Sequence, residues 1–550
     1  MPAPAASAVR SRRLAAAFAL GLGLVLLATA SGCAKREAPA AAGLRTKTLL
    51  LGNAAEPGDL DPHLASILTD QIVVNALFEG LTVLDERTTA PLPAAAESWS
   101  ASADGLVWTF RLRAGLRWSD GSPLAASDFV ASWRRVLDPG FASDNASYLF
   151  VLKNAEAFAT KKLADPAVVG AAAPDARTVV LTLENPVPYL PALVSMPAWF
   201  PVNLRAIAAH GAPDRRGTPW TRPGRLVGNG AFILAEWQPN ARLVLAKNPL
   251  HRDAATAALE RVIFFPIESP DVEERDFRAG QLHVTFNLPV TKVAGWRERD
   301  PDKLRVDATS QINFIRFNTT RPPLDDPRVR RALSLVVDRA LLAKSVLQGS
   351  RAPAAAFTPP GTGGYTARAA VPTDVAAARA LLAAAGFKDG AGLPVLDLQC
   401  RNDEIMPRLA EALQAIWLRD LGLRTTISQV EQKTWVQNQQ SLNYAISTAA
   451  WTADFPDPVT FLGLFAGDSS YNWTGWKHAD YDRLLAQAAR TADAAARFEL
   501  LQQAEAVLLE SAPVAPVYLG AQTYLIDPAV KNWEPAPLVF RRLQRVELRN

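Results

Sequence analysis

Hydrophobic and polar positions alternate along the chain with two different periods. From residue 108 to residue 113, Trp, Phe and Leu occupy every second position, and Thr and Arg lie between them. The turn signals Asp104-Gly105 and Asp120-Gly121 flank this stretch. A period of two between turns predicts a strand with one buried face. The apolar run from Tyr444 to Ser447 predicts a second strand, buried in the core.

Other segments have the longer period of helices. Asp326 followed by Pro327 is a typical helix start, and apolar residues then keep helical spacing up to Leu341, which predicts a helix that ends before Gly349. The ranges 373–385 and 493–510 predict two further helices. Because strands and helices alternate, the chain is expected to be a mixed α/β protein with more than one lobe.

The amino-terminal region has the pattern of an export signal. Basic residues precede an apolar stretch from Leu14 to Leu27, which is too short to span a bilayer comfortably, and small residues precede Cys33. This pattern resembles a bacterial lipoprotein signal. It implies that residues 1–32 are removed, that Cys33 is acylated, and that the protein lies in the periplasm or cell envelope, lipid-anchored to a membrane. An ordinary cleaved signal peptide is the alternative. Residues 33–44, rich in Ala and Pro, are then expected to form a flexible tether.

Composition indicates a large exported body that does not bind nucleic acid. The 550 residues are 49% hydrophobic and 20% charged, which is enough for more core than one domain usually holds. The formal net charge is only +4, and Arg10, Arg12 and Arg13 of the signal contribute to it. A basic surface for nucleic acid is therefore not expected. Of the 2 Cys, one is expected to carry the lipid, which leaves Cys400 without a disulfide partner.

Motifs for catalysis are missing from the sequence. The 5 His residues are scattered, and there is no His-Glu-x-x-His pair, Gly-x-Ser-x-Gly elbow or phosphate-binding loop. We therefore expect no enzyme, no metal and no cofactor. Asp454 and Asp457 could be imagined as paired carboxylates, but this proline-rich turn gives them no reason to converge on one bond. Two solvated turn acids are the simpler interpretation.

The run from Trp451 to Pro458 follows the strand predicted at residues 444–447 and reads Trp-Thr-Ala-Asp-Phe-Pro-Asp-Pro. An acid after a buried strand and beside a Trp is costly to desolvate unless a cation meets it. Asp454 could instead only cap a turn ahead of the prolines. The run resembles the Trp-x-Ala-Asp segment of periplasmic oligopeptide-binding proteins. That resemblance implies that Asp454 pairs with the α-ammonium group of a bound peptide.

Further motifs with the same resemblance follow in order along the mature chain. The chain is similar to the dipeptide/oligopeptide solute-binding proteins (family 5) of ABC transporters in the motifs Leu60-Asp61-Pro62-His63, Phe78-Glu79-Gly80-Leu81, Arg117-Trp118-Ser119-Asp120-Gly121, Gly228-Asn229-Gly230-Ala231-Phe232 and Pro323-Leu324-Asp325-Asp326-Pro327. The resemblance implies a periplasmic-binding-protein clamshell of class II, cluster C type, with two lobes and an extra inserted domain. Residues 45–310 and 521–550 would form lobe I, with the extra domain at about 80–205, and residues 311–520 would form lobe II.

The resemblance also implies how a ligand is held. A short peptide would add a strand between two closing lobes, so that main-chain groups supply the affinity and wet pockets tolerate many side chains. Trp451 would wall one pocket. The expected partners are short peptides and the membrane permease subunits of an ABC importer, and the binding protein itself is expected to be a monomer. The residues expected to pair with the peptide are Ala65, Ser66, Ile67, Ala450, Trp451 and Thr452.

The chain departs from the enterobacterial oligopeptide binders at several expected ligand positions. Thr448 and Met406 stand where those relatives place an Arg and a His against the peptide carboxylate. The cationic clamp at that end is therefore expected to be missing, although Arg401 or another base brought in by the fold could replace it. The half-cystines of those relatives fall on Gln311 and Thr452. A cell-wall (murein) peptide as ligand, and a chaperone-like peptide-binding lipoprotein, stay open as alternatives.

Overall fold

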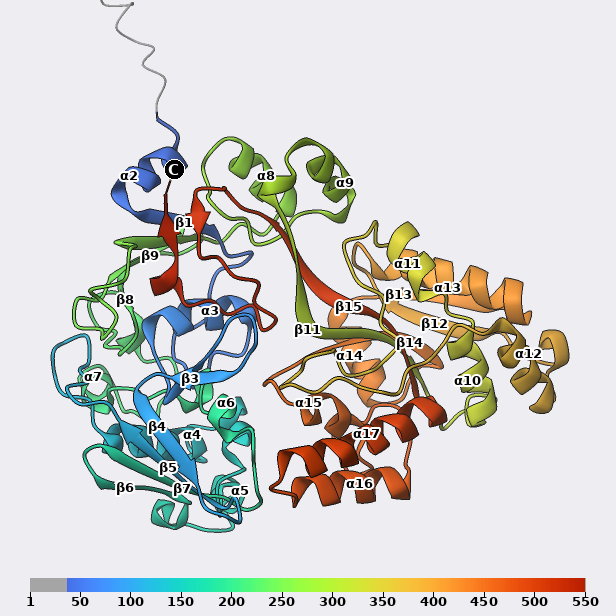
Figure 1. Cartoon of the computed structure of the whole chain (residues 1–550), viewed down its shortest axis with the longest axis horizontal. Coiled ribbons are helices and arrows are strands. Elements are labelled where there is room, and N and C mark those ends of the chain that lie inside the picture. Colours follow the sequence, from blue (N-terminus) through green and yellow to red (C-terminus); the bar gives the residue numbers. More distant parts are fainter. Residues whose placement is uncertain (1–36, 550) are drawn as a thin grey trace, which may run out of the picture.

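The computed structural model describes residues 37–549. The signal predicted over residues 1–32, and Cys33, lie outside the described residues. The chain forms two lobes (Figure 1). In this view the blue-to-green first half of the chain makes the left lobe, the yellow-to-orange part makes the right lobe, and the carboxyl terminus returns to the left lobe beside β1. The predicted two-lobed α/β fold is confirmed.

A 4-stranded sheet forms the upper part of the left lobe. Strand β1 is parallel to β10, and the other neighbours are antiparallel. Alternate apolar residues of these strands, among them Leu49 and Phe264, are buried in one core. The strand order is β1 (Thr48–Gly52), β10 (Arg261–Phe265), β9 (Arg242–Lys247) and β8 (Phe232–Gln238). The accompanying helices are α3 (Leu68–Leu77), α7 (Leu204–Ala208), α8 (Pro270–Arg278) and α9 (Val290–Arg299).

A second 4-stranded sheet, antiparallel throughout, lies in the lower part of the left lobe (Figure 1). Trp108, Phe110 and Leu112 of β5 are buried in a core of their own, which confirms the predicted half-buried strand. The order is β4 (Ala96–Ala101), β5 (Val107–Leu112), β7 (Thr178–Thr182) and β6 (Ala171–Asp175). Around it lie the hairpin β2 (Thr82–Leu84) and β3 (Pro91–Pro93) and the helices α4 (Ala126–Leu137), α5 (Ala155–Ala159), α6 (Leu190–Leu193) and the 3-10 helix η1 (Asp144–Leu149).

The right lobe is built on a 5-stranded mixed sheet with a large core between the sheet and its helices. The order is β13 (Thr425–Val430), β12 (Leu396–Arg401), β14 (Ile446–Thr452), β11 (Leu304–Phe317) and β15 (Val514–Leu525). The helices are α10 (Pro327–Leu335), α11 (Arg339–Ser345), α12 (Val375–Ala384), α13 (Met406–Leu421), α14 (Gln432–Gln440), α15 (Val459–Leu462), α16 (Ala479–Ala489) and α17 (Ala494–Ser511). Near the carboxyl terminus, in the left lobe, a small antiparallel pair is formed by β16 (Val530–Lys531) and β17 (Glu547–Leu548).

The long strands β11 and β15 connect the two lobes (Figure 1). They pair antiparallel from Leu304 opposite Leu525 to Arg316 opposite Val514, with an irregular register between residues 308 and 312. At one end, Leu304 and Leu525 pack with Trp296 of α9. At the other end both strands belong to the sheet of the right lobe. Any rotation of one lobe against the other must therefore bend or twist this strand pair.

The predicted helix starts are confirmed at their capping residues, but one predicted helix is two. The carboxylate of Asp326 accepts a hydrogen bond from the N–H of Arg328 at 2.8 Å and begins α10. The helix expected to continue to Leu341 ends at Leu335, and Asp338 caps α11 by accepting from the N–H of Leu341 at 2.9 Å. Helical spacing of apolar residues alone does not reveal such an internal cap.

Helix α2 (Pro39–Thr46) occupies the last part of the segment expected to be a flexible tether. The N–H of Ala40 donates to the carbonyl of Gly280 at 2.9 Å, and the carbonyl of Ala40 lies 2.9 Å from Nε2 of His283. The tether prediction is therefore wrong for residues 39–44, because an Ala-rich stretch behind a Pro at the first helical position forms a helix when it can dock. Within residues 37–549, no helix combines the length and apolar character that crossing a membrane requires.

Candidate functional site

Strand β14 has one neighbour along its whole length and another only at its start. Strand β11 pairs with all of it, from Phe317 opposite Ile446 to Gln311 opposite Thr452. Strand β12 pairs only with Ile446 and Ser447. Within the described part of the chain, the second half of β14 therefore has a free edge on the side away from β11. A free strand edge is a place where an extended peptide can add as a further strand.

The register of β14 decides which main-chain groups face this free edge. The N–H of Ala453 donates to the carbonyl of Ser310 at 2.7 Å, so that this residue faces β11. Because the direction alternates along an antiparallel pair, the N–H and C=O groups of Trp451 also face β11, and those of Ala450 and Thr452 face the free edge. The Trp451 ring instead contributes a wall, 5.3 Å from the ring of Tyr471 at an angle of 67°.

Asp454 lies in the turn after β14 and is half-buried. The hydroxyl of Tyr148 donates to one carboxylate oxygen at 3.2 Å, and that of Thr460 donates to the other at 3.4 Å. Within residues 37–549, no Lys, Arg or His nitrogen lies within 4.0 Å of this carboxylate. Burial raises the pKa of Asp454, and the two hydroxyl groups lower it again only in part. A cation brought to this place would stabilise the ionised form.

Asp457, three residues further on, has a different environment. Its two carboxylate oxygens accept hydrogen bonds from both terminal nitrogens of Arg497, each at 2.7 Å, and the two side chains are 5% and 4% exposed. The interpretation of two solvated turn acids is thus wrong for Asp457, which is neutralised inside the right lobe. Neighbouring Phe455 stacks on Tyr189 of the left lobe, with ring centres 5.0 Å apart. The turn therefore has one acid with a counter-charge and one without.

The segment from Ala65 to Ile67 approaches the same turn through η1. The side-chain amide of Asn145 donates to the carbonyl of Ala65 at 3.2 Å, while Tyr148, one turn later in the same 3-10 helix, contacts Asp454. Ser66 is exposed, and Ile67 is 50% exposed ahead of α3. A single short helix thus contacts both the segment 65–67 predicted for peptide pairing and the acid predicted for the peptide ammonium group.

Neutral side chains stand at the two positions where relatives were expected to have cations. Thr448 is 2% exposed and its hydroxyl has no hydrogen-bond partner in the described region, and Met406 is 4% exposed at the start of α13. Arg401, at the end of β12, already contacts Asp403 at 3.3 Å. Gln311 lies directly opposite Thr452 and donates to its hydroxyl at 2.9 Å, so that a hydrogen bond stands where a disulfide was expected in relatives.

Comparison with known proteins identifies the family. The profile of the bacterial extracellular solute-binding proteins, family 5, matches residues 90–473. The chain belongs to this family. The chain is 36% identical to the probable deoxycholate-binding periplasmic protein YgiS of Escherichia coli K12, over 87% of this chain and 89% of that protein. It is 34% identical to the periplasmic oligopeptide-binding protein OppA of Salmonella typhimurium LT2, over 92% and 93% of the two chains.

A solved structure of this family has a similar fold. The unliganded open form of MppA, a periplasmic murein tripeptide-binding protein, aligns with a TM-score of 0.80 at 32% identity over 92% of this chain and 97% of that one.

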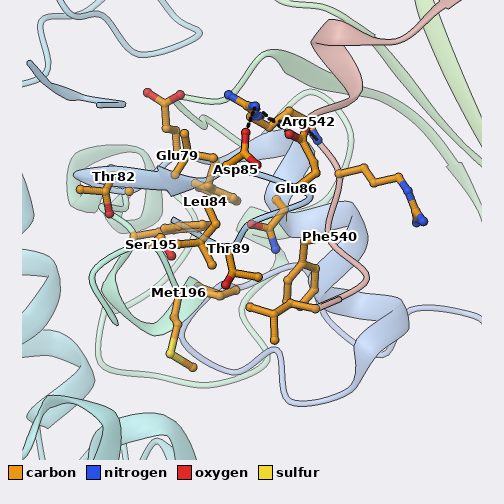
Figure 2. A pocket seen from close by; sticks show the side chains of 18 of the residues that line it. Glu79, Thr82, Leu84, Asp85, Glu86, Thr89, Ser195, Met196, Phe540 and Arg542 are labelled. Atoms are coloured by element: carbon orange, nitrogen blue, oxygen red, sulfur yellow. Dashed lines mark hydrogen bonds and ion pairs between the residues drawn. The ribbon is translucent and has the colours of Figure 1, made fainter. Parts of the chain in front are cut away.

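A cavity of about 80 Å³ lies on the left-lobe side of the 454–456 turn. Figure 2 shows its lining, with Met196 and Phe540 at one end and Arg542 close to Asp85 and Glu86 at the other. Arg542 donates to both oxygens of Glu86, at 3.0 and 2.6 Å, so these charges are already matched. Asp454 and Pro456 line this cavity together with residues of the left lobe.

Tyr148 and Thr460 were not found by reasoning from the sequence. Tyr148 is 306 positions from Asp454 in sequence, and nothing in its local pattern marks it as a partner of an acid. Thr460 has a weak signal, because a hydroxyl residue shortly after an acid often bonds back to the same turn.

Proposed function

We propose that this family 5 protein is the extracytoplasmic substrate-binding lipoprotein of an ABC peptide importer. A short peptide would lie between the two lobes, with its α-ammonium group at Asp454. Its main chain would pair with the free edge of β14 at Ala450 and Thr452 and, from the other lobe, with the segment 65–67. The protein would work in the periplasm as a monomer and would deliver the peptide to the membrane subunits of the importer.

One observation carries this proposal: an acid without a counter-charge stands at the end of a strand with a free edge. Asp454 has hydroxyl partners only, whereas Asp457 in the same turn has Arg497. A peptide that runs antiparallel to β14 begins at the Asp454 end of that strand. Its amino terminus would then supply the missing cation, and its backbone the missing strand partner. A ligand without an amine satisfies only half of this arrangement.

The protein should accept peptides of many sequences, because main-chain groups would supply most of the binding. Main-chain groups of Ala450 and Thr452 cannot distinguish side chains, and the wet space around them tolerates differences. Neutral Thr448 and Met406 offer the carboxyl terminus no charge partner at one set distance from Asp454. The peptide length is therefore expected to vary.

Closure of the lobes would rotate one of them about β11 and β15. The separate apolar cores support the predicted division into residues 45–310 with 521–550 and residues 311–520, and they support an extra domain at about 80–205. The register irregularity between residues 308 and 312 falls near the proposed boundary. Strand pairs that pass between lobes are a known place for hinge motion.

The anchor belongs to this proposal as well. Cys33 would carry the lipid, and residues 34–38 would link it to the docked helix α2. Short linkage of this kind would keep the body close to the membrane and to the permease.

Cell-wall peptides are a second candidate for the ligand, because the MppA structure that aligns with this chain is that of a murein tripeptide-binding protein. Deoxycholate, named for YgiS, carries a carboxylate and no amine, so Asp454 would repel it. Mass spectrometry of ligand that co-purifies with the natively expressed protein separates these cases. Recovered short peptides of varied sequence support the importer, a uniform muropeptide supports the second candidate, and long unfolded chains would indicate a chaperone.

The direct test uses one peptide with a free and with an acetylated amino terminus. Loss of one partner of a desolvated charge pair costs about 2–5 kcal/mol, so acetylation should weaken binding by roughly 30-fold to several thousand-fold. Asp454→Ala should remove most of this difference. If wild-type protein binds both peptides equally, Asp454 does not receive the ammonium group and the proposed binding mode is wrong.

A further inference from the structure

Arg316 is a buried cation with almost no partners. It lies on β11 and is 3% exposed. One terminal nitrogen donates to the side-chain oxygen of Gln439 at 2.8 Å, and Nε has no partner among the described residues. Within residues 37–549, no carboxylate lies within 4.0 Å of this guanidinium. Burial lowers the pKa of Arg316, yet a guanidinium stays protonated, so the charge persists.

The other buried arginines of the described chain are fully engaged. Arg135 pairs with Asp61 at 2.6 Å and Arg497 pairs with Asp457 at 2.7 Å. Arg330 and Arg339 have no acid at this distance, but each donates to several main-chain carbonyl groups. A guanidinium has five N–H donors, and Arg316 is the buried arginine of residues 37–549 that uses them least. Leaving such donors unpaired inside a protein is costly unless a ligand supplies acceptors.

The register places Arg316 on one face of the sheet, in the last row before the free edge of β14 begins. Arg316 is opposite Ser447, and Trp451 lies on the same face four residues further along β14. The guanidinium carbon lies 5.4 Å from the ring centre of Phe314, which is the partner of Ala449. The guanidinium thus contacts a residue of the next row on this face, where β12 no longer covers β14. Ala449 has only a methyl group, so no long side chain of β14 stands between this charge and the edge.

Aromatic walls and other unpaired polar atoms complete the surroundings. The ring of Trp473 lies 5.2 Å from the guanidinium carbon, and Tyr471 links it to Trp451. The indole N–H of Trp451 and the side-chain oxygen of Gln399 also lack partners in the described region. Gln399 is opposite Ser447 and so shares this face. An amide can present oxygen or nitrogen, whereas the indole and the guanidinium only donate. Hydrogen-bond donors therefore outnumber acceptors among these unpaired atoms. This suits a carboxylate, because an ionised carboxylate only accepts hydrogen bonds.

We propose that the group of side chains formed by Arg316, Gln439, Trp451 and Trp473 receives an acidic side chain of the bound peptide. The proposal rests on the function proposed above. A peptide strand at the free edge lies two strand spacings, about 9.6 Å, from β11 and begins beyond the row of Arg316, so a Glu side chain and the Arg316 side chain would meet on the diagonal between them. Side chains of an extended peptide alternate between faces. The preference for an acid should therefore occur at one peptide position and be absent at the positions directly beside it.

The test uses tetrapeptides of Ala with a free amino terminus and an amidated carboxyl terminus, so that a side chain supplies the only carboxylate. Glu or Gln is placed at position 2, 3 or 4, and binding to ligand-free protein is measured by calorimetry. We expect wild-type protein to bind Glu at least tenfold more tightly than Gln at one position and not at its neighbour. Acetylated versions of the same peptides report on Asp454 separately.

Two variants identify Arg316 as the source of the preference. Arg316→Gln removes the charge, and Gln439→Glu supplies a carboxylate from the protein itself. Both should bring the Glu-to-Gln ratio close to one while the loss on acetylation stays. Because the cation is unpaired, ligand-free Arg316→Gln should melt no lower than wild type.

Two further outcomes would overturn the inference in different ways. Equal binding of Glu and Gln at every position, with acetylation still harmful, would refute the role of Arg316 and leave the proposed function intact. If both variants still prefer Glu to Gln, the role of Arg316 is also refuted and the proposed function again stays intact. If no peptide binds, or if acetylation has no effect, the proposed function fails and the assignment of Arg316 fails with it.

Discussion

Asp454→Asn and Asp457→Asn should have opposite consequences for stability and for peptide binding, although the two residues are only three positions apart. Asp457 and Arg497 form a buried pair with two hydrogen bonds of 2.7 Å. Asp457→Asn leaves the guanidinium without a counter-charge, which typically costs about 3–5 kcal/mol of stability. Asp454→Asn keeps an oxygen that accepts from Tyr148 and removes a charge that burial disfavours. Its folded state should be as stable as that of wild type, or slightly more so.

Peptide affinity should fall strongly in Asp454→Asn and little in Asp457→Asn. Asp454→Asn removes the partner proposed for the peptide ammonium group, so affinity should fall by roughly 30-fold to several thousand-fold, which corresponds to about 2–5 kcal/mol. Asp457→Asn keeps that partner and should bind within about tenfold of wild type at a temperature where it is folded.

Circular dichroism melts of the ligand-free proteins and calorimetry with a free-amine peptide measure the two effects independently. Wild type and the double variant complete the set, because independent roles predict that the two effects add. The reasoning is refuted if Asp454→Asn lowers the melting temperature as much as Asp457→Asn does. It is equally refuted if Asp454→Asn binds the peptide as tightly as wild type.

Three further predictions concern the anchor, the far end of the ligand and pH. Cys33→Ser should move the protein from the membrane fraction to the soluble fraction, and unchanged retention would exclude the lipid anchor. Amidation of the peptide carboxyl terminus should change affinity by less than about tenfold, since a hydroxyl such as that of Thr448 offers one hydrogen bond of about 1 kcal/mol; a length optimum that amidation abolishes would contradict this. Burial, with the nearby Arg135 guanidinium, lowers the pKa of His63 to about 4. The unfolded state then binds a proton first, so stability should be intact above pH 6.5 and fall by up to about 3 kcal/mol towards pH 4. His63→Gln should flatten the melting temperature over this range, and an unaltered slope would show that other groups cause it.

Helix caps and hydrophobic periodicity predicted several elements correctly. The predicted cap Asp326 marks the start of α10 because a short acidic side chain satisfies the first N–H groups of a helix, and the predicted range 493–510 begins at Asp493, which caps α17. The period of two predicted β5, since one face of that strand packs on a core. The break at Asp338 was missed because the apolar spacing of a helix continues through an internal cap. The docked helix α2 was missed because it depends on a distant segment that offers a place to pack, which no local pattern contains.

Some residues of the candidate site could be predicted from the sequence and others could not. Asp454 and Trp451 were found because their run is compact and resembles a known segment. Tyr148 and Arg316 were not found, since each becomes meaningful only through neighbours that are more than a hundred positions away.

By itself the sequence determined the α/β character, the family and the acid expected to meet the ligand, because these depend on periodicity, caps and contiguous motifs. Only the tertiary structure decided which acids and bases have partners. Asp457 meets Arg497, while Asp454 meets hydroxyl groups and Arg316 meets one amide. Tertiary structure also decided that β12 stops short of the end of β14. The physical reason is that desolvation and charge pairing depend on distances in space, and strands and helices far apart in the chain set those distances.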